Sequence, residues 1–326
     1  MNNYLSIYIG GTGRSGTNIL KKILCEHPEA FGLPFEPRYM LDPDDIFDFY
    51  KSQTWSPYII DFKLRRLYKL LHNLAKRDAM DQFTIFLYNV LKINKRSFTP
   101  PRYQKWELNK HIPHFTDHVE MLFNEIIEVD YPSYWCGSDS FQRNNKSFLA
   151  QPPYKNKVKE ALIRFIDRNI ASILEKNNAS TYIDDSTFNI LHAEEISELC
   201  KNARLIHIFR DPRDVVASYI QQNWVPDDLH SAINWYKSVI QEWEEIKRKL
   251  PEDFFLEIRF ENLVQDFHGI IKKIETFSGI RFSEMQSTIS LDKPNIGRWK
   301  NSFSHDDQQL LNDGLQEELR LLNYNT

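Results

Sequence analysis

The stretch GGTGRSGTN, from Gly10 to Asn18, decides the fold, because it directly follows the apolar run Leu5–Ile9. An apolar run, a glycine-rich turn and then an amphipathic helix are typical of the start of a doubly wound α/β sheet. The spacing predicts a strand over Leu5–Ile9 and a helix over Thr17–His27, which Pro28 ends. The residues expected on the apolar face of this helix are Ile19, Leu20, Ile23 and Leu24.

The glycines of this stretch and the hydroxyl residue after them predict an anion-binding loop. Backbone N–H groups at the start of a helix bind anions, and glycines let the main chain come close to them. Thr17 and Asn18 can donate from the first helical turn. A loop for ATP or GTP has a lysine before the hydroxyl residue, whereas here Thr17 follows Gly16 and the nearest fixed cation is Arg14. We therefore do not expect ordinary ATP or GTP hydrolysis; a glycine-rich turn without a ligand is the alternative.

Length, charge and cysteine content exclude several classes of protein. The chain has 326 residues, enough for one large α/β domain or two modest ones. Its net charge of −4 argues against non-specific nucleic-acid binding. The cysteines form no C-x-x-C pair, which indicates a reducing compartment rather than a disulfide framework or a zinc ribbon. No apolar stretch approaches the roughly 18 residues of a membrane span. We expect a cytoplasmic protein that binds neither nucleic acid nor membrane, unless a further segment precedes the chain. The three cysteines are Cys25, Cys136 and Cys200.

The middle of the chain differs from its two ends. From about residue 42 to 180 aromatic residues and lysines are frequent and glycine is almost absent. We interpret this region as a large helical insertion or lid that forms part of an acceptor pocket. Helices are predicted there over Phe62–Lys76, Thr116–Val129 and Asn156–Lys176.

Alternation of strands and helices resumes after this insertion and predicts a mainly parallel sheet with helices on both faces. Predicted strands are Ser180–Asp184, Arg204–Phe209 and Phe254–Phe260. Predicted helices are Leu191–Lys201, Arg213–Asn223, Leu229–Leu250, Leu263–Phe277 and a final one over Asp306–Leu322. The expected buried side of the longest helix is Ile233, Trp235, Tyr236, Ile240 and Trp243.

A second anion site is predicted by IFRDPRDVVASY, from Ile208 to Tyr219. Arg210 ends a predicted strand, at the edge of the sheet where open α/β folds bind ligands, and Ser218 lies in the next helix. A guanidinium and a hydroxyl can hold a second phosphate. Alternatively, Arg210 makes a structural ion pair. For Arg213 and Asp214, near the start of this helix, the alternative is that they only cap the turn.

Together the two segments resemble the sulfotransferases that use 3′-phosphoadenosine 5′-phosphosulfate (PAPS). RFENLVQDF, Arg259 to Phe267, and IGRWKNSF, Ile296 to Phe303, are similar to two further segments of these enzymes, in the same order. The resemblance implies one P-loop-like sulfotransferase domain over residues 1–326, PAPS as donor, 3′-phosphoadenosine 5′-phosphate (PAP) as product, and no metal. The implied donor contacts are Gly13, Arg14, Ser15, Gly16, Thr17 and Asn18 at the 5′ side, Arg210 and Ser218 at the 3′-phosphate, and Arg298, Trp299 and Lys300 in the closing loop.

The catalytic roles also follow from resemblance. FEPR, Phe35 to Arg38, resembles the E-x-R element of tyrosylprotein and related sulfotransferases, in which the glutamate is the base. This implies that Glu36 takes the acceptor's proton and that Arg38, a candidate substrate-binding residue, has a supporting or orienting role. Arg14 is expected to stabilise the charge on the leaving group. The alternative is that Glu36 simply pairs with Arg38.

Two positions depart from the family pattern. Many relatives have a lysine where this chain reads YIDDSTFN, with Asp184 and Asp185. Asp185 is therefore a candidate second base, a group that binds a cationic acceptor, or only a strand-end or helix-cap residue. Gly297 stands before Arg298 where relatives often have a hydroxyl residue.

The histidines of HIPHFTDH, His111 to His118, lie three and four residues apart, a spacing that can bind a metal on one helix face. Pro113 interrupts the pattern and Thr116 is expected to be an N-cap. We interpret the three residues as surface and lid histidines.

The sequence thus predicts a cytoplasmic sulfotransferase that acts on a hydroxyl or amine of a small molecule, such as a carbohydrate or secondary metabolite. The alternatives are a P-loop small-molecule kinase, a protein-tyrosine sulfotransferase and a non-catalytic nucleotide-binding module. The acceptor's identity and the quaternary state, monomer or homodimer, are left open.

Overall fold

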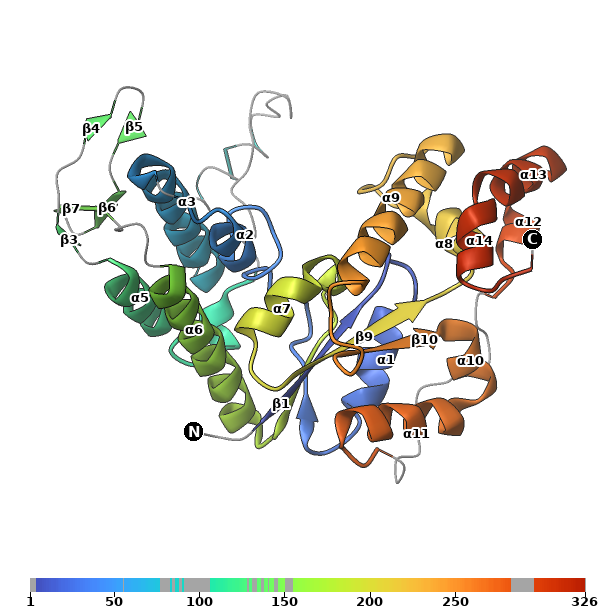
Figure 1. The fold of residues 1–326 in the computed structure, drawn as a ribbon, viewed down its shortest axis with the longest axis horizontal. Coiled ribbons are helices and arrows are strands. Elements are labelled where there is room, and N and C mark those ends of the chain that lie inside the picture. Colours follow the sequence, from blue (N-terminus) through green and yellow to red (C-terminus); the bar gives the residue numbers. More distant parts are fainter. Residues whose placement is uncertain are drawn as a thin grey trace. The chain divides into compact units, whose positions relative to one another are not determined.

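The computed structural model describes residues 4–54, 56–76, 106–127, 155–282 and 296–325, with short pieces within 83–90 and 129–149. The chain divides into two compact units, each described by itself (Figure 1). The first is mainly Leu33–Asn178, with Met1–Asn2 and Leu199–Lys201. The second comprises Asn3–Gly32, Ala179–Glu198 and Asn202–Thr326. The predicted insertion lies largely within the first unit, and the assignment of the whole chain to one sulfotransferase domain stays a prediction.

A five-stranded parallel sheet forms the centre of the second unit, which confirms the predicted α/β class. Its strands are, in spatial order, β10 (Phe255–Arg259), β9 (Ala203–Phe209), β1 (Leu5–Gly10), β8 (Thr181–Asp184) and β2 (Ala30–Phe31). In the register of the sheet, Ile7 of β1 lies beside Ile183 of β8 and Arg204 of β9. Because the strands are parallel, the loops that follow β1, β8 and β9 leave the same edge of the sheet.

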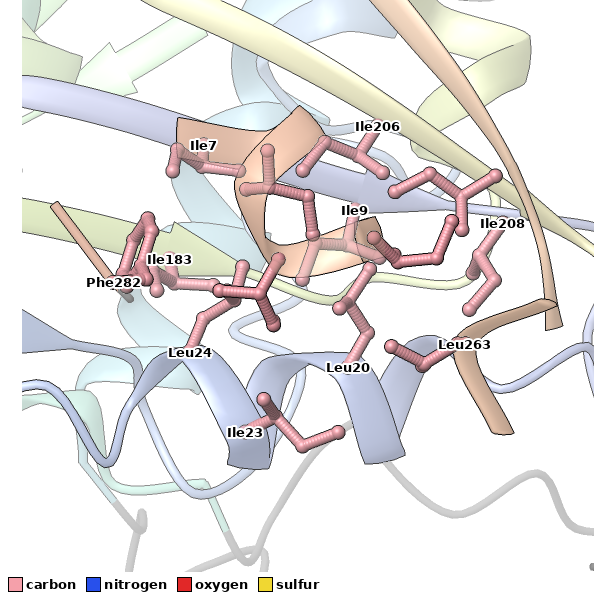
Figure 2. Close-up of a cluster of buried hydrophobic side chains, with 14 of the residues drawn as sticks. Ile7, Ile9, Leu20, Ile23, Leu24, Ile183, Ile206, Ile208, Leu263 and Phe282 are labelled. Atoms are coloured by element: carbon pink, nitrogen blue, oxygen red, sulfur yellow. The ribbon is translucent and has the colours of Figure 1, made fainter. Parts of the chain in front are cut away.

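Aliphatic side chains of the strands bury one face of this sheet under α1 (Thr17–Leu24), α10 (Phe260–Gln265) and α11 (Phe267–Ser278). Figure 2 shows Ile7 and Ile9 of β1, Ile206 and Ile208 of β9 and Leu20 of α1 as members of one apolar cluster. Because alternate residues of a strand point to opposite faces of the sheet, these isoleucines all lie on the face that α1, α10 and α11 cover. This packing fixes the start of α1 at the end of β1, where the glycine-rich loop lies.

The opposite face of the sheet packs against α9 (Leu229–Lys247). Trp243 of this helix is fully buried, with its ring 5.1 Å from that of His207 on β9 and 5.6 Å from that of Phe255 on β10. Four of the five residues predicted for the buried side of α9 are buried. Trp235 is the error, since its side chain is on the exposed side of the helix.

Several predicted helix boundaries are wrong. The helix predicted over Leu263–Phe277 is broken at Asp266, whose backbone leaves the helical region and whose side chain caps α11 by accepting from Gly269 N. The C-terminal helix is likewise two helices that meet at Leu315. Helix α1 ends three residues before its predicted end, and α8 (Pro212–Tyr219), the helix after β9, ends four residues before its predicted end. The two C-terminal helices are α13 (His305–Gly314) and α14 (Gln316–Leu321).

The described part of the second unit has three further short elements. They are η2 (Asn189–His192), α7 (Ala193–Leu199) and α12 (Trp299–Ser302). Helices α8, α9, α12, α13 and α14 share a second apolar cluster that includes Trp299 and Leu311. The C-terminal segment is therefore packed on α8 rather than trailing from the fold.

The first unit is helical, as predicted, but it also contains short antiparallel strands. Its helices are α2 (Ile46–Lys51), α3 (Pro57–Ala75), η1 (Leu108–Lys110), α5 (Phe115–Ile126) and α6 (Lys155–Asn177). Its strands are β3 (Val129–Asp130), β4 (Tyr134–Trp135), β5 (Ser138–Asp139), β6 (Phe141–Arg143) and β7 (Lys146–Leu149). The helix predicted to reach Val129 stops at Ile126, because Val129 pairs with Leu149 in a strand. No helix in the described part of the chain is both long and apolar enough to cross a membrane.

Candidate functional site

The glycine-rich loop is held by its neighbours on both sides. Gly11 N donates to Thr187 O after β8 at 2.8 Å, and the Tyr219 hydroxyl of α8 donates to Thr12 O. The backbone then turns through left-handed conformations, with φ of 84° at Gly13, 58° at Arg14 and 111° at Gly16. Two of these three positions are glycines, which adopt positive φ at little cost.

Space also requires glycine in the loop, at Gly10 and Gly11 as well as at the two glycines with positive φ. A Cβ atom on Gly13 would lie 2.9 Å from Trp224 Cη2, and one on Gly16 would lie 2.6 Å from Phe260 Cδ2. The Trp224 ring is 46% exposed and packs edge-on against Tyr219, with ring centroids 5.6 Å apart. This indole therefore covers one side of the loop without being part of the core.

The loop fits an anion such as a phosphate. Helix α1 begins at Thr17 after Gly16, which has no side chain to cap the first N–H groups, and its first turn contains no acidic residue. The helix dipole at this end favours negative charge. Ser15 Oγ is buried and has no hydrogen-bond partner among the described residues. Uncapped amides with an adjacent spare hydroxyl are the donor set that a phosphate or phosphosulfate group requires.

The two predicted anion sites meet at Arg14 and Ser218. Arg14 is exposed overall, but its Nε atom donates to Ser218 Oγ at 2.9 Å. Arg210, at the end of β9, is buried; its guanidinium lies 5.6 Å from the centre of the Phe260 ring and 3.3 Å from Asp214 Oδ2. The ion pair that was the alternative for Arg210 is therefore present.

Asp214 does not cap the turn, which was the alternative left open for it. Asp211 caps α8, because its side chain accepts from Arg213 N at 2.9 Å. The carboxylate of Asp214 instead accepts from Gly297 N at 2.7 Å and from Trp299 N at 3.0 Å. These bonds attach the C-terminal loop to α8.

The three predicted donor contacts of the C-terminal loop have distinct places. Trp299 is buried and its ring lies under the Arg213 guanidinium, 4.4 Å from its centre. The Arg298 guanidinium donates to Gln221 Oε1 at 2.6 Å, and Lys300 Nζ is 5.7 Å from the Trp299 ring. Two cations are thereby presented beside α8, while the tryptophan anchors the loop.

The segment RFENL ties the C-terminus to the same region. Arg259 donates to the carbonyl oxygens of Leu322 and Asn323, at 2.9 and 2.6 Å. Glu261 accepts from Asp211 N at 3.0 Å and from the Tyr324 hydroxyl at 2.7 Å. The described contacts give this motif a structural role at the start of α8.

The paired aspartates after β8 have separate roles. Asp184 Oδ1 accepts from Ser186 N at 2.8 Å, so it shapes the turn at the strand end. Asp185 lies 2.6 Å from Lys21 Nζ on α1 and accepts from Asn18 Nδ2 at 3.2 Å. The side chains of Lys21 and Asp185 are 9% and 6% exposed. Lys21 of α1 thus places its cation beside Asp185, in the segment YIDDSTFN that itself contains no lysine.

Glu36 and Arg38 belong to the first unit. Their side chains form an ion pair, and Arg38 NH1 also lies 3.2 Å from Asp42 Oδ1. Trp106 Nε1 donates to Glu36 O at 2.7 Å, and its ring lies 6.2 Å from that of Phe35. The predicted base is thus part of a segment that several contacts hold in place.

Two expectations about the histidine segment are wrong. Helix α5 begins at Phe115, so Thr116 is not its N-cap; Thr116 N donates to Asn109 Oδ1 at 3.1 Å instead. His118 is buried rather than at the surface, and its Nδ1 lies 2.8 Å from Asn169 Oδ1. Burial lowers the pKa of His118, which favours the neutral imidazole.

Sequence reasoning missed Lys21, Trp224 and the actual role of Asp214. Lys21 lies four residues after Thr17, so helical spacing alone would have placed it beside the anion loop. Asp214 lies four residues before Ser218, a spacing that also indicates one shared face of α8. No sequence signal identifies Trp224, because its loop contact depends on the path of the chain after α8.

The comparisons with known proteins identify one family. Residues 137–284 match the model of the sulfotransferase family. This segment contains Arg210, Ser218 and the RFENL motif; the glycine-rich loop and the C-terminal loop lie outside it. No curated protein matches the chain in sequence.

Three solved structures are similar over most of the chain. The sulfotransferase domain of the olefin synthase of Synechococcus PCC 7002 has a TM-score of 0.45 at 14% identity and covers 96% of this chain and 94% of that one. The sulfotransferase domain of the curacin biosynthetic pathway has a TM-score of 0.48 at 11% identity, with coverages of 100% and 99%. Sulfotransferase STF9 of Mycobacterium avium has a TM-score of 0.44 at 11% identity, with coverages of 100% and 78%. The chain is thus similar to the sulfotransferase family over residues 137–284, slightly less than half of its length.

Proposed function

We propose that the protein transfers a sulfuryl group from PAPS to a hydroxyl or amine of a small-molecule acceptor, a carbohydrate or a secondary metabolite. The observation that carries this proposal is the hydrogen bond between Arg14 and Ser218, which joins the two anion sites. A nucleotide with phosphates at both 5′ and 3′ positions requires two such sites close together. ATP and GTP present one phosphate chain and would leave the second site unused.

The residues of each site have the chemistry that its phosphate requires. The backbone N–H groups from Gly13 to Asn18, with the hydroxyls of Ser15 and Thr17, would hold the 5′-phosphosulfate. Arg210 and Ser218, with Arg298 and Lys300 of the C-terminal loop, would hold the 3′-phosphate. Bound PAPS supplies a sulfuryl group whose bond to the 5′-phosphate oxygen breaks as the acceptor oxygen or nitrogen bonds to sulfur.

Arg14 and Glu36 are the proposed catalytic residues. Arg14 would stabilise the negative charge that develops on the leaving oxygen by donating hydrogen bonds from its guanidinium. Glu36 accepts the proton that the acceptor loses. Arg38 orients the Glu36 carboxylate, and Trp106 holds the main chain at this position.

Titration calorimetry with PAP, ATP and GTP tests the donor. We expect PAP to bind more tightly than either triphosphate, because only PAP can engage Arg210 and Ser218 together with the loop. Tighter binding of ATP would instead support a small-molecule kinase. Mass spectrometry of acceptor mixtures incubated with PAPS, read for a mass gain of SO3, then identifies the acceptor.

Replacing Glu36 tests the base. E36Q keeps the shape of the side chain and its bond to Arg38 but cannot take a proton, so turnover should fall about a hundredfold or more while PAP affinity is unchanged. E120Q, which alters a carboxylate on α5 of the same unit, is the control. Full turnover in E36Q would remove Glu36 from the mechanism, and binding of PAP without any turnover in the native protein would indicate a non-catalytic module.

A further inference from the structure

Asp214 is the buried acid that attaches the C-terminal loop to the second anion site. Its side chain is fully buried in α8. Oδ2 accepts from Gly297 N at 2.7 Å, and Oδ1 accepts from Trp299 N at 3.0 Å. Each carboxylate oxygen is therefore used by a different amide of the same loop.

The same carboxylate also holds the cation proposed to bind the 3′-phosphate. Arg210 NH2 lies 3.3 Å from Asp214 Oδ2. The Phe260 ring lies against the Arg210 guanidinium, 5.6 Å from ring centre to Cζ. Asp214 and Ser218 are four residues apart in α8, so they share one face of this helix, and Arg210 directly precedes its N-cap residue Asp211.

The conformation of the C-terminal loop depends on these bonds. Gly297 has φ of 73°, and a Cβ atom placed on it would meet nothing within 4 Å. Glycine is thus required here for its backbone conformation rather than for space. The loop then presents Arg298, which is the N-cap residue of α12, and Lys300, which lies within this short helix.

A buried carboxylate beside an anion site opposes anion binding by Coulomb repulsion. By its charge alone, Asp214 would therefore weaken anion binding at this site. Its hydrogen bonds offset this repulsion, because they fix Arg210 and the loop that carries Arg298 and Lys300 relative to each other.

We propose that Asp214 is a positioning residue that makes the site selective for nucleotides with a 3′-phosphate. The inference rests on the proposed function, since it concerns the 3′-phosphate of PAPS and PAP. A 3′-phosphate uses Arg210 and the loop cations together, and it gains from having them aligned. A nucleotide without this phosphate uses only the glycine-rich loop and gains nothing from Asp214.

The ratio of the affinities for PAP and adenosine 5′-monophosphate (AMP) tests this role. Both ligands carry the 5′-phosphate, and only PAP carries the 3′-phosphate. D214N places an amide NH2 where the carboxylate accepts hydrogen bonds, so it cannot accept from both loop amides and Arg210. We expect PAP affinity to fall about tenfold or more and AMP affinity to change less than about threefold, both measured by calorimetry.

A second variant keeps the test decisive if D214N does not fold. G297A leaves Asp214 in place and disturbs only the loop backbone, so it should lower the PAP-to-AMP ratio in the same direction. D266A is the control for general destabilisation, because it removes the cap of α11 without touching the loop or α8. The ratio in D266A should equal that of the native protein.

The outcomes separate this inference from the proposed function. If D214N or G297A weakens PAP and AMP by the same factor, Asp214 is only structural and the inference is wrong. If the native protein itself binds PAP no more tightly than AMP, the proposed function is wrong. A ratio that falls in D214N and G297A but not in D266A supports the positioning role.

Discussion

Arg14 Nε donates to Ser218 Oγ across 2.9 Å, although the two residues are 204 positions apart in the chain. The bond joins the loop after β1 to the helix after β9, so the two motifs of the sequence form one site. The bond also holds the side chain of Arg14, a residue that is exposed and has a left-handed backbone conformation. Because this side chain is already held by a hydrogen bond, it loses less conformational entropy when a ligand binds, which favours binding.

Replacing Ser218 with alanine should weaken PAP binding. The change removes a hydroxyl that holds Arg14 and that we assign to the 3′-phosphate. Hydrogen bonds to charged groups contribute about 1.5–3 kcal/mol, so the affinity should fall by about tenfold or more. Calorimetry with PAP measures it. S238A removes a comparable helix hydroxyl, which bonds only within α9, and should bind PAP normally; equal affinities in both variants would contradict the assignment.

Gly13 should tolerate no side chain. G13A would force an alanine into φ of 84° and place its Cβ 2.9 Å from the Trp224 ring. The left-handed backbone alone costs about 1–2 kcal/mol, and the clash adds a displacement of the loop. We expect a large loss of PAP affinity, measured by calorimetry.

Gly279 provides the matched control for this prediction. It has φ of 79° at the end of α11, and a Cβ there would meet nothing within 4 Å. G279A therefore carries the backbone penalty without the clash or the loop. It should lower the denaturation midpoint and leave PAP affinity unchanged; a similar loss of affinity in both variants would show that the loop is not the cause.

The pair of Lys21 and Asp185 should matter first for stability. Removing one member of a buried ion pair leaves an uncompensated charge and costs about 3–5 kcal/mol. We expect D185N and K21M each to be strongly destabilised in urea unfolding, and the double variant to recover much of the loss. This double-mutant cycle measures the coupling between the two side chains.

The same variants decide between the roles that the sequence left open for Asp185. If the pair is structural, K21M should lower turnover in proportion to the folded fraction, as D185N does. A D185N protein that is stable but inactive would instead support Asp185 as a base or acceptor-binding group. Turnover corrected for the folded fraction distinguishes these results.

Much of the fold could be predicted because local signals determine it. The apolar runs located four of the five strands of the central sheet to within one residue at each end, whereas the two-residue strand β2 was missed. The break at Asp266 was missed because apolar residues continue at helical spacing on both sides of it; its signal was an aspartate, a preferred N-cap residue, which accepts from Gly269 N. Helix ends in general depend on caps and tertiary packing rather than on periodicity.

The site was predictable in its motifs but not in its connections. Asp211 and Asp214 both lie near the start of α8, and either could have capped it. Only the approach of residues 296–300, some 80 positions away, determines that Asp214 is occupied by that loop. The partner of Asp185 likewise lies 164 positions away on α1. Long-range pairs of this kind are set by the packed fold, which one sequence does not encode in any local pattern.

Glu257 on β10 should make the protein less stable in acid. Burial by itself would raise the pKa of this carboxyl, but the hydrogen bond from His207, the charges of His207 and Lys247, and the bond from Trp243 outweigh it and lower the pKa from 4.5 to about 2. A carboxyl whose pKa is lower in the folded state stabilises the fold above its unfolded pKa. This contribution is therefore complete above about pH 4.5 and is lost as the pH falls toward 2.

Urea unfolding of the native protein and E257Q across this range measures the effect. At pH 7 we expect E257Q to be less stable by about 2 kcal/mol, after allowance for the part of the side chain that water reaches. The difference should shrink below pH 4.5 and vanish near pH 2, because the native carboxyl is then protonated and resembles the amide. E244Q is the control, since Glu244 also pairs with Lys247 but has no bond to His207. A difference between E257Q and the native protein that stays constant with pH would show that Glu257 contributes through packing and not through its charge.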